Sequence, residues 1–90
     1  MRKIEEQMVR AVRTMRNWRS GNTEVKIQYG FVYVYLHGHH IATIDQHGGV
    51  EVNKPTLRSF PTNTTKSRLR ALGVDVYTKN HVTYLNGEPV

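Results

Sequence analysis

The chain contains no cysteine, and this absence removes two large classes of small protein. Without thiols it has neither a disulfide framework nor a thiolate zinc site, and it suits a reducing compartment. No apolar run approaches the roughly 20 residues of a membrane-spanning helix, and the charged start lacks the apolar core of a secretion signal. We therefore expect a soluble, intracellular protein with no membrane partner.

Acidic residues are also scarce, since 7 Asp and Glu face 13 Lys and Arg and leave a net charge of +6. Residues 1–20 carry six basic and two acidic groups, and residues 54–70 carry five basic groups and no acidic one. Two basic flanks around a nearly neutral centre favour a polyanion partner such as nucleic acid. The alternative is that the charge only keeps a small domain soluble.

The 90 residues are enough for one domain, 1–90, with a modest core, so association with a second copy stays open. The strongest pattern is at residues 31–36, where aromatic and aliphatic side chains alternate as in a strand with two different faces. The aliphatic side chains, Val34 among them, predict the core face. Shorter alternating segments separated by glycine-containing turns extend this strand to an antiparallel meander over residues 23–53.

The opposite face of this strand carries Tyr33 and Tyr35. A phenol ring has an apolar body and a polar tip, so it suits a partly wet surface. On an open sheet these tyrosines are candidates for stacking against the bases of a single strand. The alternative is that a second layer of the protein covers them.

Residues 1–19 place apolar side chains at steps of three and four, which predicts an amphipathic helix packed on the sheet. Trp18 closes the apolar stripe and is expected to fix the helix end. Arg10, Arg13 and Arg16 lie away from the stripe. They form either a ridge that contacts phosphates or an ordinary solvated helix face.

The second half of the chain has fewer strand signals. Pro55 and Pro61 predict an irregular loop over residues 54–63. Residues 64–72 then predict a short helix, and residues 74–85 a final hairpin. The expected class is α+β, with an N-terminal helix on a five- to six-stranded antiparallel sheet and a short second helix before the last hairpin.

The second helix offers the clearest phosphate-binding pattern. Its start has free backbone N–H groups and threonine hydroxyls, and Lys66 and Arg70 are expected to face outward one turn apart, while Arg68 borders Leu72. The alternative is a capped surface helix with solvated charges. The candidate nucleic-acid-binding residues are Arg10, Arg13, Arg16, Lys54, Arg58, Lys66, Arg68 and Arg70.

Histidines are the other chemistry-bearing feature. Four of them lie in or near turns of the meander, at His37, His39, His40 and His47. Imidazole is a common metal ligand, but no carboxylate pair or second histidine motif completes a set of four ligands. No nucleophile motif, P-loop or dinucleotide fingerprint is present. The sequence therefore predicts no metal, no cofactor and no enzyme.

Four segments carry a resemblance: SGNTEV (20–25), YLHGHHIA (35–42), TTKSRLRALG (64–73) and VDVY (74–77). In these segments the chain resembles small uncharacterised accessory proteins of tailed bacteriophages. The resemblance implies a phage origin and an accessory role in the cytoplasm of an infected bacterial host, but no site residue. Two hypotheses follow. The protein binds DNA or RNA without catalysis, or it inhibits a host protein such as a transcription or defence enzyme.

Overall fold

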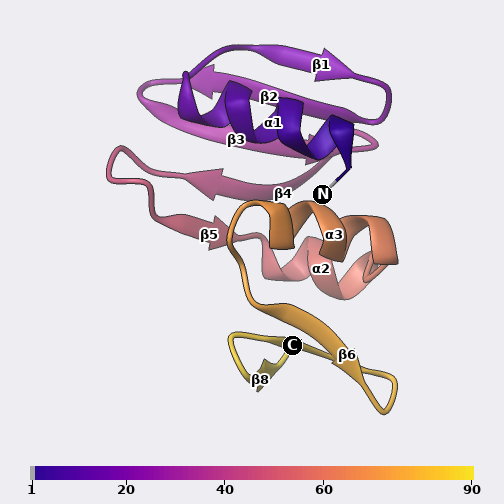
Figure 1. The fold of residues 1–90 in the computed structure, drawn as a ribbon. Helices are drawn as coiled ribbons and strands as arrows, with labels where there is room; N and C mark the ends of the chain where they lie inside the picture. The colour runs from indigo at the N-terminus through magenta and orange to yellow at the C-terminus, as the bar shows by residue number, and fades with distance from the viewer. Residues whose placement is uncertain (1) are drawn as a thin grey trace.

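The computed structural model describes residues 2–90 and has the predicted α+β class (Figure 1). Its elements in chain order are α1 (Lys3–Arg13), β1 (Trp18–Ser20), β2 (Thr23–Gln28), β3 (Phe31–Leu36), β4 (His39–Ile44), β5 (Val50–Val52), α2 (Lys54–Ser59), α3 (Asn63–Ala71), β6 (Val76–Lys79), β7 (Val82–Leu85) and β8 (Glu88–Pro89). The first five strands form one antiparallel sheet in chain order. The last three form a separate sheet instead of extending the first.

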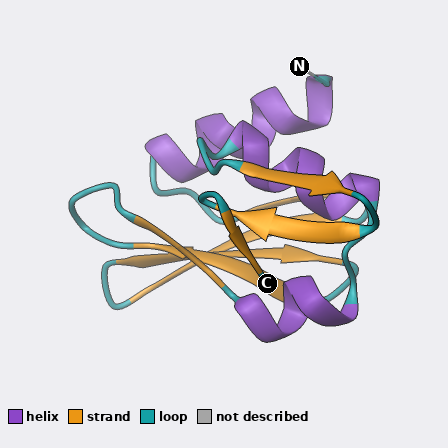
Figure 2. Ribbon diagram, turned by 90° about the horizontal axis from the view of Figure 1, so that it is seen from below, coloured by secondary structure: helices purple, strands orange, loops and turns teal. Residues whose placement is uncertain are grey.

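The core lies between the five-stranded sheet and two helices, α1 and α3, which lie on the same side of it (Figure 2). Met8 of α1, Leu69 of α3 and Val34 of β3 are all 0% exposed at the centre of this layer. The aliphatic face predicted for β3 is therefore the core face.

The N-terminal helix is shorter than the sequence predicted. It ends at Arg13, and Trp18–Ser20 is a strand that pairs with β2. Met15 has a left-handed backbone (φ 51°) that stops the helix, and the Asn17 side chain accepts the N–H of Ile27 at 2.8 Å. The helix was predicted too long because Trp18 also packs against the core, although it does so from strand β1, and so it matched the apolar stripe of the helix. The predicted start at Met1 lies outside the described residues.

The loop predicted for residues 54–63 is also wrong, because α2 occupies its first part. Pro55 sits in the first turn of this helix, where the proline lacks only an N–H that would have no helical partner. Asn53 caps the helix by accepting the N–H of Thr56, and Leu57 is buried. The helix lies beside β4, in the space that β5 leaves free.

The C-terminal sheet projects from the body of the molecule at the end far from β1 (Figure 1). Val76 and Leu85 are buried and attach it to α3 and the core. The predicted hairpin is confirmed, but the expected tail after it adds a third strand, β8. Tyr77 and Tyr84 stack on its surface with ring centroids 5.2 Å apart.

Candidate nucleic-acid interface

The face of the large sheet opposite the core carries aromatic side chains from β3. Of the helices in residues 2–90, α1 and α3 pack on the core face and α2 lies beside β4, so this second face has no helical cover over β2 and β3 (Figure 2). Phe31 is 39% exposed there, and Tyr33 and Tyr35 are half-buried by their neighbours. We call this surface, with Lys26 and His40, the tyrosine face.

Lys26 supplies a cation in the middle of the tyrosine face. It pairs with Tyr33 across β2 and β3, and its Nζ lies 5.3 Å from the centroid of the Tyr35 ring. Arg19 pairs with Glu24, which pairs with Tyr35, so Arg19 shares the same face one strand further out. Aromatic rings with flanking cations are the two components of a single-strand binding surface.

A bulge in β4 places His40 on this face. Tyr35 pairs with His40 whereas Val34 pairs with Ala42, so Ile41 is an extra residue in the ladder. Without the bulge, positions 40 and 43 would point to opposite sides of the sheet. With it, the His40 ring lies among the tyrosines, with its centroid 5.6 Å from each of the Tyr33 and Tyr35 rings.

The orientation of the His40 ring follows from a chain of hydrogen bonds. The oxygen of the Asn53 amide caps α2 by accepting from Thr56 N–H, so its Nδ2 group faces His40 and donates to Nδ1 at 3.2 Å. The His40 proton is then on Nε2, which donates to the Thr43 hydroxyl oxygen at 2.8 Å. Because the Thr43 oxygen accepts this hydrogen bond, the hydrogen of the Thr43 hydroxyl points away from His40 and is free to be donated to another group.

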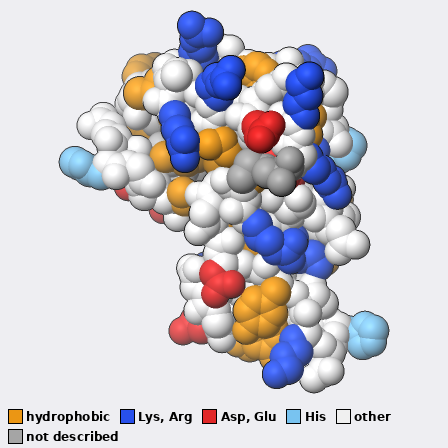
Figure 3. Space-filling model, in the orientation of Figure 1, with side chains coloured by type: hydrophobic (Ala, Val, Ile, Leu, Met, Phe, Trp, Pro, Cys, Tyr) orange, Lys and Arg blue, Asp and Glu red, His pale blue; other side chains and the backbone are white. Residues whose placement is uncertain are grey.

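Six of the predicted basic residues are exposed. Arg10 and Arg13 lie on α1, Arg16 follows its end, Lys54 and Arg58 lie on α2, and Arg70 lies on α3. Figure 3 shows Lys and Arg side chains spread over the side of the molecule that carries α1 and α3. Since the tyrosine face is on the opposite side of the sheet, the arginines of α1 and the tyrosines form two separate surfaces.

Two predicted contact residues are buried instead. Lys66 is 6% exposed and donates through Nζ to the Thr78 hydroxyl, so the expectation that it faces solvent is wrong. Arg68 is 3% exposed and forms an ion pair with Glu5, with Nη1 and Oε2 2.8 Å apart. The basic segment therefore has a partner for its charge, which lies more than 60 residues earlier in the chain.

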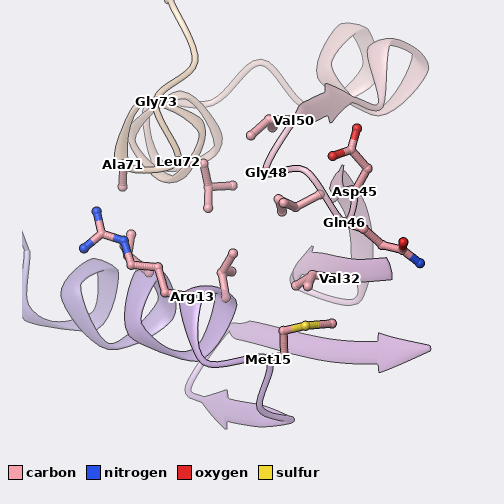
Figure 4. Close-up of a pocket in the computed structure, with 13 residues that line it drawn as sticks. Arg13, Met15, Val32, Asp45, Gln46, Gly48, Val50, Ala71, Leu72 and Gly73 are labelled. Carbon is pink, nitrogen blue, oxygen red and sulfur yellow. The ribbon is translucent and has the colours of Figure 1, made fainter. Parts of the chain in front are cut away.

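The structure also contains an apolar groove that the sequence did not indicate (Figure 4). It has a volume of about 470 Å³ and lies between the C-terminal ends of α1 and α3 and the turn after β4. Leu72, Val50 and the half-exposed Met15 line it, and Arg13 and Asp45 lie at its rim. Three distant segments meet here, so no local pattern predicts the groove.

The histidine-rich turn makes aromatic contacts. His39 stacks on Phe60 with centroids 4.2 Å apart, and His40 contacts the tyrosines. No group of three His, Asp or Glu side chains within residues 2–90 is placed to hold a metal ion. Among the helices of that range, none has the length and apolar character needed to cross a membrane.

Together these features define a small α+β protein with an aromatic sheet face on one side and an apolar groove on the other. The chain belongs to the Kyanoviridae Gp96 protein family, whose model matches residues 1–90. This is a family of bacteriophage (cyanophage) proteins, so the phage origin implied by the resemblance is confirmed. No curated protein and no solved structure matches the chain.

Proposed function

We propose that this phage protein binds single-stranded nucleic acid, without catalysis, through the tyrosine face, in the cytoplasm of the infected bacterium. The observation that carries the proposal is the pair Tyr33 and Tyr35 on a sheet face without helical cover, with a cation over one ring. Stacking of a base on an aromatic side chain contributes about 1–3 kcal/mol and tolerates any base.

The cations around the face supply the contacts to phosphate. Lys26 lies between the tyrosines, Arg19 lies toward β1, and Lys54 lies next to His40 at the start of α2. The arginines of α1 on the far side add long-range attraction to a polyanion. Lys66 and Arg68 are excluded from the contact set because the fold already engages them.

Fluorescence anisotropy with labelled oligomers of DNA and RNA, measured over a range of salt concentrations, tests the proposal. Tyr33→Ala and Tyr35→Ala should each weaken binding about 30-fold, the middle of the range for one lost stacking contact. Tyr77→Ala on the second sheet is the matched control and should leave the affinity unchanged. If the double variant at 33 and 35 keeps its fold and its affinity, the tyrosine face is not the binding surface.

The apolar groove favours a second candidate, the inhibition of a host protein. An apolar side chain of a partner would fill the space between Leu72 and Met15, and Arg13 on the rim would attract an acidic neighbour. In this case a host protein should be captured from nuclease-treated lysate. Capture should be lost in Met15→Glu and kept in Tyr33→Ala, whereas the nucleic-acid hypothesis expects the reverse for oligonucleotide binding.

A further inference from the structure

A hollow of about 520 Å³ lies at the edge of the tyrosine face, where His40 lines it. It is lined by His40, Thr43, Glu51, Val52, Asn53, Lys54 and Pro55. Tyr33 pairs with Thr43 across β3 and β4, and Thr43 pairs with Glu51 across β4 and β5. The three side chains therefore form a row on one face of the sheet.

The spacing of this row suits one nucleobase. Neighbouring strands are roughly 4.8 Å apart, so the side chains of Tyr33, Thr43 and Glu51 follow one another at about that interval. A base stacked on Tyr33 with its edge toward β5 passes over Thr43 and reaches Glu51. The edge of the base is then read by these two polar side chains.

The hydrogen-bond chain through Asn53 and His40 determines what Thr43 offers. Its oxygen accepts from His40 Nε2, and within residues 2–90 no hydrogen bond uses its own hydrogen, so Thr43 can donate into the hollow. The exposed carboxylate of Glu51 can only accept hydrogen bonds, and within residues 2–90 its side chain forms no ion pair or hydrogen bond. The hollow thus presents a donor and, one strand further out, a charged acceptor.

We propose that this hollow is a guanine-selective subsite, an inference that rests on the proposed binding of single strands. The Watson–Crick edge of guanine carries O6, an acceptor, followed by N1–H and the N2 amine, two adjacent donors. O6 matches Thr43, and the two donors match the two oxygens of Glu51 in a charge-assisted pair of hydrogen bonds. Lys54 on the rim of the hollow matches the neighbouring phosphate.

The other bases fit this order less well. Adenine and cytosine each offer the carboxylate a single amine, so they form one charge-assisted bond where guanine forms two. Uracil and thymine place their one N–H between two carbonyl oxygens, which a carboxylate repels. Guanine is therefore favoured by the pairing of donors with Glu51, and the N2 amine is the group on which the preference depends.

The test uses thymidine octamers with a single central guanine, hypoxanthine, adenine or cytosine. Hypoxanthine is guanine without the N2 amine, so it isolates that contact. The wild-type protein should bind the guanine oligomer about tenfold more tightly than the hypoxanthine oligomer, toward the lower end of the range for a bidentate base contact, because hypoxanthine keeps N1–H and loses one of the two bonds. Glu51→Gln should weaken binding to the guanine oligomer, because an amide offers one neutral acceptor in place of two charged ones, and the guanine preference should collapse.

Two further variants sharpen the test. Thr43→Val removes the hydroxyl and should lower the guanine preference without changing the salt dependence. Glu88→Gln, on the second sheet, removes the same charge at a distance and should keep the preference. If octamers bind in a Tyr33-dependent way with equal affinity for guanine and hypoxanthine, the subsite is overturned and the proposed function stands. If no octamer binds, both fail.

Discussion

Arg68 Nη1 lies 2.8 Å from Glu5 Oε2, in an ion pair that ties α3 to α1 with both side chains 4% exposed. Arg68 Nε also donates to the Thr23 hydroxyl at 3.1 Å, and the Ser67 hydroxyl donates to the same oxygen of Glu5, Oε2. One network thus joins α1, β2 and α3. The charges of the TTKSRLRAL segment that suggested a phosphate site are in part structural.

Arg68→Ala should lower the free energy of unfolding by about 3–5 kcal/mol, because the Glu5 carboxylate would remain buried without its partner. Urea denaturation measures this change directly. Arg58→Ala is the control, since Arg58 is exposed on α2 and its removal should change stability by less than about 0.5 kcal/mol. Equal midpoints for the two variants would show that the ion pair contributes nothing.

Stability should also fall in acid through Glu5. Burial raises the pKa of this carboxyl, but the hydrogen bonds from Ser67 and Arg68 and from the backbone N–H of Arg2 outweigh it, so the pKa lies below its ordinary value of 4.5. A carboxyl with a lowered pKa stabilises the fold fully above the unfolded pKa. That contribution should disappear as the pH falls from about 4.5 through the lower folded value.

Thermal melts between neutral and acidic pH check this dependence. Glu5→Gln should give a flatter profile than the wild type below pH 5, at the expense of stability at neutral pH. Asp45 also has a lowered pKa, because the backbone N–H groups of Gly49 and His47 donate to its carboxylate. Asp45→Asn should therefore also flatten the acid slope, but by less than Glu5→Gln, because Asp45 is an exposed carboxylate.

The parts of this fold that could be predicted from the sequence are those with a local period. The alternation of aromatic and aliphatic side chains in residues 31–36 correctly predicted which face of β3 faces the core, and Val34 is buried as expected. The Glu5–Arg68 pair and the apolar groove depend on segments far apart in sequence, which no local pattern joins. The bulge at Ile41 was missed for a related reason, because only the pairing with β3 reveals the extra residue.

Val34→Ala should destabilise the protein by about 1–3 kcal/mol, since the side chain is 0% exposed between the sheet and its helices. Phe31→Ala, on the same strand but on the exposed face, provides the comparison and should cost less. Denaturant titration of both variants measures the difference. A larger loss for Phe31→Ala would mean that the two faces of β3 are assigned the wrong way round.

Trp18 reports the packing of β1, because it is the only tryptophan in the chain. It pairs with Val25 and is half-buried against the core. Its fluorescence emission in the native protein should therefore lie to the blue of the emission in denaturant. An emission maximum already equal to that of the unfolded chain would place the side chain in water and exclude this strand pairing.

A comparison of two lysines distinguishes a positive charge that stabilises the fold from one that is proposed to bind phosphate. Lys66 is buried and donates to Thr78, while the side chain of Lys26 is 58% exposed on the tyrosine face. Lys66→Ala should lower stability by about 1–3 kcal/mol through the lost hydrogen bond and the lost packing of its stem. It should leave the salt dependence of oligonucleotide binding unchanged.

Lys26→Ala should do the opposite. Its removal should flatten the slope of log affinity against log salt by about 0.7, the contribution of one phosphate contact on a single strand. Its effect on the unfolding midpoint should be small, because the contact with Glu24 is exposed and 4.0 Å long. If Lys66→Ala flattens the slope of log affinity against log salt and Lys26→Ala does not, the phosphate contact lies on α3 and not on the tyrosine face.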